Sequence, residues 1–534
     1  MLYYIGVFYD TIFSTNILVW RYVMIKFVFC LLVVAFMVSC SGPQSEEYAN
    51  GDALHVDEQE YTSPHDLEQE EPEDPSVALY NDYFVTLEID PSSRSVNGFS
   101  RIVFTNRTGY NLDEIVLRTF LNAFSEGFWP LPYFAEHEQR VFRDDRDYGY
   151  MYVLYVSMDN DTLEYVHDGT VLSLSLPEPL EPGGTVQITI QFYSVIPQIA
   201  HLTGANEDAM WFGMFLPVLA VFGEDGWHTE DFYPAGSPFI LETASFHVEV
   251  TTPLRYTVVG AGLRTEETFE DTDIKITTFT AQQVRDFAFA ISHGFKHARK
   301  STESGVDIHF YYFTESIQAD EVLTIARDAM ERFEYYIGMF PFQHITIVET
   351  DISIEHASLS QVIFIDSIPL RQASFRGLTQ SIGNQWLANI VGTNRILYPW
   401  LTEGLTRFVT EAVLTESTED LVEFLKERHL SISEYTDLYL TFPLWEFESW
   451  RHYALTHGRK AMVMFYALFT VMGEEVFWNF INEYYHTFSF GMAGKDDFIG
   501  LAEEAFGASL DWFFDDWFGH GSVPEVNFAY RGDL

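Results

Sequence analysis

The residues best suited to chemistry lie between positions 378 and 411. Some of them are spaced so that a helix would place their side chains on the same face. Gln380 and Asn384 are four residues apart, so their side chains point the same way on a helix, and Ser381 lies beside them. Glu403 follows Asn384 by nineteen residues. Amide oxygens suit hard cations but bind zinc poorly, and a serine cannot replace a carboxylate as general base at neutral pH. These residue types therefore offer poor zinc ligands and no general base.

Two amphipathic helices are expected to position these residues. Apolar side chains recur at three- and four-residue spacing on both sides of a polar connection. They are Ile382, Trp386, Leu387, Ile390 and Val391 before it, and Leu401, Leu405, Phe408 and Val409 after it. Pro399 lacks a backbone donor and is expected to end any helix begun earlier. The stretch thus predicts a helix, a connection and a second helix that begins near Trp400.

The same stretch resembles the membrane alanyl aminopeptidase family, gluzincin metallopeptidases that include aminopeptidase N and leukotriene hydrolase. In that family one helix carries His-Glu-x-x-His followed by Gln-Trp-Phe-Gly-Asn, and the next carries a Glu in Trp-Leu-Asn-Glu-Gly. Here residues 385–389 read Gln-Trp-Leu-Ala-Asn, and residues 400–404 read Trp-Leu-Thr-Glu-Gly. The resemblance covers about residues 80–527.

The resemblance assigns the helical polar residues to positions of known chemistry. It places Gln380, Asn384 and Glu403 at the three zinc-ligand positions and Ser381 at the position of the catalytic Glu. A catalytic zinc needs three protein ligands and a water that a nearby base activates. Because two ligand positions and the base position are changed, the resemblance implies a degenerate site with no expected cofactor.

Two further positions carry family chemistry. Glu355 stands where the family has Gly-x-Met-Glu-Asn on an edge strand, and the resemblance implies that it receives a substrate amine. An incidental surface carboxylate is the other interpretation that these residues leave open. His457 stands where a family Tyr stabilises the oxyanion, so a fourth catalytic position is changed.

Composition and the N-terminal sequence limit the partners and the cellular location that can be expected for the protein. The net charge is -50, which excludes a nucleic-acid binder that tracks phosphates. Residues 27–38 form an apolar run after Lys26, and Ser39-Cys40 follows. This pattern resembles a bacterial lipoprotein signal in residues 1–40, with lipidation at Cys40, translation starting at Met24, and the chain held on the extracytoplasmic face of the cell membrane. A plain transmembrane anchor is the alternative.

The remaining chain divides into a tether and two domains. Residues 41–75 are acidic and poor in apolar residues, which predicts a disordered tether. Alternating strand patterns at 84–89, 98–104, 170–176, 186–190 and 246–250 predict a β-sandwich-like domain over residues 76–297. The family resemblance implies that residues 298–534 form a thermolysin-like, mainly helical α+β domain.

Within this second domain, individual side chains can be assigned to the core. Residues 307–312 and 345–349 are expected to be strands, and residues 320–338 a helix. The buried face of that helix is expected to comprise Val322, Ile325, Met330, Phe333 and Ile337. Trp512, Phe513 and Trp517 near the C-terminus are also expected in the core.

Three functions remain open from the sequence. The first is a catalytically inactive aminopeptidase homologue, a lipoprotein that binds a peptide or protein partner. The second is an active zinc aminopeptidase with a rebuilt metal site, in which Glu403 is joined by His356, His452 or His457. The third is a structural envelope component whose cleft is filled by side chains. No further partner is indicated.

Overall fold

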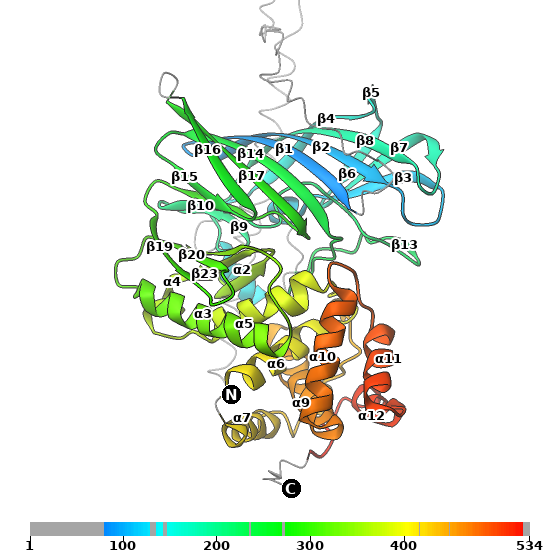
Figure 1. Ribbon diagram of the computed structural model, residues 1–534. Helices are drawn as coiled ribbons and strands as arrows, with labels where there is room; N and C mark the ends of the chain where they lie inside the picture. The colour runs from blue at the N-terminus through cyan, green and yellow to red at the C-terminus, as the bar shows by residue number, and fades with distance from the viewer. Residues whose placement is uncertain are drawn as a thin grey trace, which may run out of the picture. The chain divides into compact units, whose positions relative to one another are not determined.

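A computed structural model describes residues 80–128, 135–142, 147–233, 236–269, 273–415, 417–447 and 449–526. The expected signal segment, its Cys40 and the acidic tether lie outside the described residues. A β-rich region is followed by a mainly helical region, as the strand and helix patterns predict (Figure 1).

The β-rich region is built on an eight-stranded sheet with the order β16-β17-β14-β1-β2-β8-β4-β5. Its strands are β1 (Asn81–Asp90), β2 (Ser95–Thr105), β4 (Tyr150–Met158), β5 (Asp161–Thr162), β8 (Thr185–Val195), β14 (Ala244–Pro253), β16 (Leu263–Phe269) and β17 (Ile274–Val284). Neighbouring strands are antiparallel except β1 and β14, which pair in parallel. The predicted strand segments fall within these elements or within β7 (Val171–Leu180), apart from Thr170 just before β7.

Two smaller sheets and a hairpin pack beneath this large sheet. One sheet has the order β15-β18-β10-β9 and the other β11-β3-β7-β6. Their strands are β3 (Leu112–Arg118), β6 (Tyr165–Asp168), β7 (Val171–Leu180), β9 (Thr203–Ala205), β10 (Ala209–Phe212), β11 (Val218–Leu219), β15 (Thr257–Gly260) and β18 (Phe289–Ser292). The hairpin joins β12 (Phe222–Gly223) to β13 (Gly226–Trp227), and the short helices η2 (Phe120–Phe124) and α2 (Ala135–Phe142) interrupt the strands.

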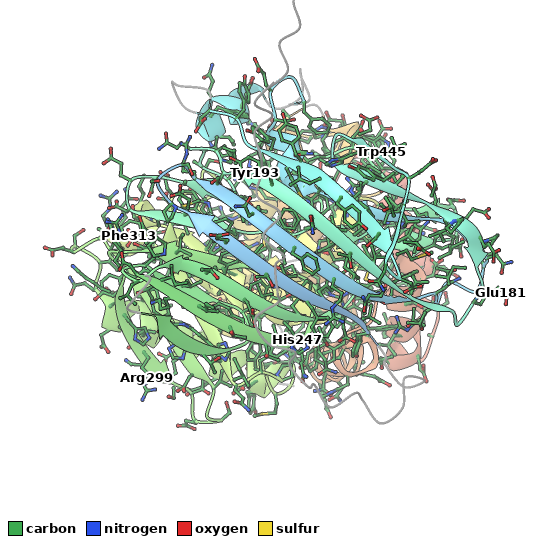
Figure 2. All side chains as sticks on the ribbon, turned by 90° about the horizontal axis from the view of Figure 1, so that it is seen from above. Glu181, Tyr193, His247, Arg299, Phe313 and Trp445 are labelled. Atoms are coloured by element: carbon green, nitrogen blue, oxygen red, sulfur yellow. The ribbon has the colours of Figure 1, made fainter. Side chains whose placement is uncertain are left out.

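Side-chain alternation explains why the large sheet has one buried and one outer face. Along β14, Phe246 and Val248 are fully buried while the intervening His247 is partly exposed. Figure 2 views the sheet from above, with Tyr193 of β8 and His247 of β14 on this outer face. The inner face contributes to one large apolar core with the smaller sheets.

A five-stranded sheet connects the β-rich and helical regions. Its order is β19-β20-β21-β23-β22, from β19 (Lys296–Ser301), β20 (Asp307–Tyr312), β21 (His344–Thr350), β22 (His356–Leu359) and β23 (Val362–Asp366). The three middle strands are parallel, and both edge strands are antiparallel to their neighbours. Val348 and Phe364 belong to the core of the β-rich region, whereas Ile347 and Ile363 belong to the core of the helical region. Each face of this sheet therefore supports a different core.

The helices cover one face of this sheet and then form a bundle. They are α3 (Ala319–Tyr336), α4 (Ser367–Arg371), α5 (Arg376–Asn384), α6 (Leu405–Leu414), α7 (Thr418–Leu430), η6 (Leu444–Glu446), α8 (Trp450–Tyr453), α9 (Ala461–Met472), α10 (Glu474–Phe488), α11 (Lys495–Phe506) and α12 (Asp511–Gly519). Three π-helical segments join them: η4 (Gln385–Ile390), η5 (Trp400–Gly404) and η7 (Ala454–Lys460). Such segments are rare and often mark functional sites.

The expected helix, connection and second helix are confirmed: the first helix ends at Ile390, and the second begins at Trp400, directly after Pro399. Two expectations about individual side chains need correction. Ile325 on α3 is only partly buried, although the rest of the expected face is buried. Trp512 was expected in the core but is 59% exposed, because it lies on the outer side of α12 while Phe513 and Trp517 face inward.

Within the described ranges, no single helix has the length and apolar character to cross a membrane. The helical segments 450–472 and 474–488 reach that length and apolar character only when they are taken together, and the angle of the bend between them is 118°.

Candidate functional site

The helix that carries the candidate residues is fixed to edge strand β22 by two amide side chains. Gln385 donates from Nε2 to Ser358 Oγ at 2.8 Å and to the Leu359 carbonyl at 3.0 Å. Its Oε1 accepts a hydrogen bond from the Gln361 backbone amide at 3.1 Å. Asn389, one turn later, donates to the same Ser358 hydroxyl at 3.1 Å. The side chains of Gln385 and Asn389 therefore position the helix against the sheet.

Ser381 and His356 form a direct hydrogen bond where α5 meets β22. The distance from Ser381 Oγ to His356 Nδ1 is 2.8 Å, and Ser381 is fully buried. Burial, with a smaller effect of the Arg407 charge, lowers the pKa of His356 to about 4. The imidazole is therefore neutral near pH 7 and accepts or donates one hydrogen bond here. Among the described residues no carboxylate bonds to the ring, so this pair lacks the third group that a nucleophilic serine site requires.

Glu403 pairs with a guanidinium on its own helix. Its Oε2 lies 3.4 Å from Arg407 Nη2, four residues further along the chain. The Glu403 side chain is 19% exposed and that of Arg407 is 38% exposed. Gly458 of η7 lies beside the guanidinium, where a Cβ would be only 3.3 Å from Arg407 Nε. The cationic partner of Glu403 in this structure is thus Arg407.

The residues present do not fit a catalytic zinc. Gln380 is buried and Asn384 partly buried, and neither side chain hydrogen-bonds to another described residue. Their amides offer weak oxygen ligands, and the guanidinium of Arg407 would repel a cation beside Glu403. In the part of the chain that the structure describes, no group of three or more His, Cys, Asp or Glu residues could hold a metal ion.

His457 lies in an apolar environment on η7. It is fully buried, and its ring is 5.0 Å from the Phe447 ring and 5.3 Å from the Tyr453 ring. Neither ring nitrogen has a hydrogen-bond partner of good geometry among the described residues. Burial lowers the pKa of His457 to about 3, despite an opposing effect of the Phe442 backbone. His457 therefore stays neutral at any physiological pH.

Tyr453 lies one helical turn before His457 and closer to the charged residues. Burial raises the pKa of Tyr453 well above its ordinary value, the Glu403 charge adds to this rise, and Arg407 and Arg395 oppose it. Glu403, Arg407, Arg395 and Tyr453 thus share one electrostatic environment. The hydroxyl of Tyr453 packs against Gly236, leaving no room for a side chain there.

Glu355 is placed differently from the other candidates. It is exposed and has a positive φ of 67° in the turn that precedes β22. Its carbonyl accepts a hydrogen bond from the Asp366 backbone amide at 2.8 Å. The next residue, His356, is the one that contacts Ser381. The structure therefore brings Ser381, His356, Glu403 and Arg407 into one region, while Glu355 lies at the edge of the sheet.

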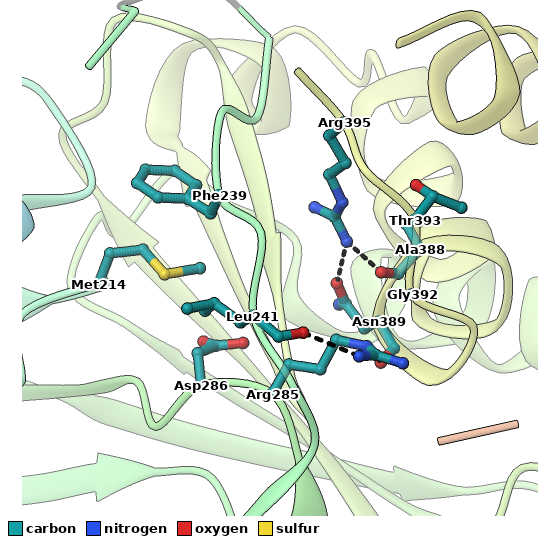
Figure 3. A pocket seen from close by; sticks show the side chains of 10 residues that line it. All are labelled: Met214, Phe239, Leu241, Arg285, Asp286, Ala388, Asn389, Gly392, Thr393 and Arg395. Carbon is teal, nitrogen blue, oxygen red and sulfur yellow. Dashed lines mark hydrogen bonds between the residues drawn. The ribbon is translucent and has the colours of Figure 1, made fainter. Parts of the chain in front are cut away.

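Two arginines, the buried Arg285 and the partly buried Arg395, contact η4 (Figure 3). Arg285 donates to the carbonyls of Asn389 at 2.8 Å, Leu241 at 2.9 Å and Ile390 at 3.0 Å, and so satisfies the C-terminal end of η4. Arg395 bonds to the Ala388 carbonyl and to Asn389 Oδ1 at 3.3 Å. Burial lowers the pKa of Arg285 to about 9. The cavity between the two guanidiniums is about 10 Å³, room for about one water molecule.

Sequence patterns did not identify the arginines as part of the site. A signal was present for Arg407, because a Glu and an Arg four residues apart on a helix commonly pair. No local signal marks Arg285 or Arg395, because Arg285 donates to backbone carbonyls more than a hundred residues away and Arg395 donates partly to Ser237, 158 residues away.

Comparisons with known proteins identify the fold. The structure is similar to an M1 zinc metallopeptidase from Deinococcus radiodurans, with a TM-score of 0.61, 16% identity, and coverage of 85% of this chain and 95% of that chain. A mutant of that enzyme gives a TM-score of 0.62 at 16% identity, covering 83% and 94% of the two chains. The mutant bound to a Tyr-Ser-Ala substrate gives 0.61 at 15%, covering 84% and 95%. No family model and no curated protein matches the sequence.

These likenesses show that the chain has the fold of the M1 zinc metallopeptidases, which are aminopeptidase N-like gluzincins.

Proposed function

We propose that this protein is a non-catalytic homologue of the M1 aminopeptidases that binds a peptide or protein ligand in the former metal cleft. Its helical region corresponds in this proposal to the thermolysin-like catalytic domain of the active enzymes. Lipidation of Cys40 holds the protein on the extracytoplasmic face of a bacterial cell membrane, and the acidic tether of residues 41–75 separates it from the bilayer.

The ion pair between Glu403 and Arg407 is the observation that carries this proposal. In a zinc site, the carboxylate at this position would face a divalent cation, but here it faces a guanidinium at 3.4 Å. The general-base position holds Ser381, whose hydroxyl bonds to a neutral imidazole. Both changes remove the means of activating a water molecule.

Residual exposure favours ligand binding over a cleft filled by side chains. Among the described residues Arg407 donates one hydrogen bond, to Glu403, so most of its five N–H donors are free, and 38% of its side chain is exposed. The amides of Gln380 and Asn384 are also free of hydrogen bonds to described residues. A guanidinium and two amides make a good receptor for a carboxylate, such as a peptide C-terminus or an acidic side chain.

The first experiment tests for catalysis. Metal analysis of the purified full chain should find substoichiometric zinc, and aminopeptidyl-amide substrates should not be hydrolysed. Zinc near one per chain, with hydrolysis lost in Glu403→Ala, would overturn the proposal in favour of the rebuilt metallopeptidase.

The second experiment tests for binding with the tripeptide Tyr-Ser-Ala, which a similar enzyme holds as its substrate. Calorimetric titration should show binding without cleavage, and Arg407→Gln should weaken it about tenfold. Blocking the peptide C-terminus as an amide should weaken binding to a similar extent. Arg371→Gln, which changes an exposed arginine on α4, is the matched control. Absence of saturable binding would instead support the structural envelope component.

A further inference from the structure

A second cavity lies away from the former metal cleft, between edge strand β16 of the large sheet and one face of the five-stranded sheet (Figure 1). Its volume is about 500 Å³, within the range of about 300 to 1,000 Å³ for small-molecule sites. Residues of β15, β16, β20 and β21 and of the turns beside them form its wall. Because neither Ser381, Glu403 nor Arg407 lines it, this cavity is separate from the site described above.

The strand register brings three histidines and a tyrosine together at this cavity. His309, Tyr311 and His344 line it, and His297 of β19 lies directly opposite Tyr311 on the same face of the sheet. The ring of His297 stacks on that of Tyr311, with centroids 4.5 Å apart. His344 meets His309 at a steep angle, with centroids 6.1 Å apart. The cavity therefore has one wall made of imidazole rings.

Two of these histidines are joined by a hydrogen bond that leaves their outer nitrogens available. His297 Nε2 lies 3.0 Å from His309 Nδ1. The other ring nitrogens, His297 Nδ1 and His309 Nε2, bond to no described residue. A neutral pair has one N–H on an outer nitrogen, whereas one added proton turns both outer nitrogens into donors and keeps the bond between the rings. One proton thus converts this pair into two parallel N–H donors with a positive charge.

An unpaired guanidinium lies beside the two histidines. Arg299 of β19 is directly opposite His309, so both side chains are on the same face of the sheet. Arg299 is exposed, and it forms no hydrogen bond or ion pair with a described residue. Figure 2 shows it at the edge of the molecule. Its N–H donors are therefore available to a ligand.

Two carboxylates line the cavity, but both already have partners. Glu266 pairs with Arg264 and also lies 3.4 Å from Lys275 Nζ, so two cations face one carboxylate. Asp307 accepts a hydrogen bond from the Ser301 hydroxyl at 2.5 Å. With all histidines neutral, three cationic side chains and two carboxylates thus surround the cavity in the described part of the chain: Arg264, Lys275 and Arg299 against Glu266 and Asp307.

The pKa values of the histidines are consistent with this excess of positive charge. Burial lowers the pKa of His297, and two guanidiniums lower it further. At His309, burial and then the neighbouring His297 and His344 lower the pKa to about 4, ahead of the opposing charge of Asp307. Burial also lowers the pKa of His344, where Asp307 and the Gly262 backbone oppose it. A bound anion would raise the pKa of these rings, because it would offset the neighbouring cations.

We propose that this cavity binds the phosphate group of a small phosphate monoester, held by Arg299 and by the outer nitrogens of His297 and His309. A guanidinium and two imidazoles supply several N–H donors, which match the three terminal oxygens of a phosphate. Among the described residues no group of histidines could hold a metal ion instead. A free small molecule is favoured over a lipid headgroup, because the net charge of -50 would repel an anionic bilayer. This site is independent of the function proposed for the former metal cleft.

The first test titrates the full chain calorimetrically with inorganic phosphate at pH 6.5 and constant ionic strength. Phosphate should bind at one saturable site, and Arg299→Gln should weaken it about tenfold or more. Because Arg299 is exposed, this variant should keep the melting temperature of the unaltered chain. Arg255→Gln, at an exposed arginine outside the cavity, is the matched control and should leave binding unchanged.

The second test uses sulfate, whose own charge does not change between pH 7.5 and pH 5.5. Sulfate should bind about tenfold more tightly at pH 5.5, because the histidine pair takes up a proton with it. His309→Gln should remove this pH dependence, and His293→Gln, at an exposed histidine outside the cavity, should retain it. The charged and titratable groups that face the pair are Arg264, Glu266, Lys275, Arg299, Asp307, Tyr311 and His344.

The proposal is overturned if phosphate shows no saturable binding, if Arg299→Gln binds it like the unaltered chain, or if sulfate binds equally well at both pH values. Phosphatidic acid vesicles offer the same phosphate group on a bilayer. Sedimentation of the chain with these vesicles that Arg299→Gln abolishes would overturn the assignment to a free small molecule.

Discussion

His457 should make the protein sensitive to acid, and replacing it with Phe should remove part of that sensitivity. Its ring is fully buried among Phe447 and Tyr453, with no well-formed hydrogen bond at either nitrogen. The folded state lowers its pKa from 6.5 to about 3, so protons bind the unfolded chain more tightly. The contribution of the neutral His457 to the unfolding free energy is therefore fully present above pH 6.5 and is lost as the pH falls from 6.5 toward 3.

The size of the effect follows from this shift. At pH 5, the unfolded histidine is almost fully protonated and the folded one is neutral. The difference of about 1.5 pH units from the ordinary pKa corresponds to about 2 kcal/mol of unfolding free energy. His457→Phe should thus lose about 2 kcal/mol less than the unaltered chain between pH 7.5 and pH 5.

Urea unfolding followed by circular dichroism at both pH values measures this difference. Comparing each chain with itself at two pH values cancels the packing cost of the larger Phe ring. His486→Gln, at an exposed histidine of α10, is the control and should keep the full acid loss. If His457→Phe loses as much stability at pH 5 as the unaltered chain, His457 is not held neutral by burial and the reasoning fails.

Two further stability predictions follow from contacts described above. Gln385→Leu should lower the unfolding free energy by about 3 kcal/mol, because it leaves the buried Gln361 amide and Leu359 carbonyl without partners, whereas the exposed Gln372→Leu should have little effect in the same urea titration. Trp517→Ala should cost about 3 to 5 kcal/mol and Trp512→Ala less than about 0.5 kcal/mol, and equal costs would contradict their opposite burial.

Local patterns were sufficient for most of the fold. Period-two alternation located β14 and β8, and the helical repeat located α3 to within two residues at each end, because burial on one face imposes these periods directly. Trp512 was misassigned because its position within a run of aromatic residues does not reveal which side of α12 faces the core.

The candidate site could be predicted only in part. The apolar repeat predicted a second helix that begins near Trp400, so it placed Glu403 near the start of that helix, but it did not predict the pairing of Glu403 with Arg407. Contacts such as Ser381 with His356 and Arg285 with Asn389 join residues that are distant in the sequence. No period in the sequence encodes them, because tertiary packing alone determines which distant side chains meet.

The polar residues of the helix that begins at Arg376 differ in their contacts, and this difference bears on how the sequence of this protein could change during evolution. Gln385 and Asn389 hold the helix to β22, so a population selected only for folded protein would have to retain them. Gln380 and Asn384 bond to no other described side chain and are free to vary under the same selection. Under the non-catalytic function proposed above, random drift would change positions 380 to 384 and preserve Gln385 and Asn389.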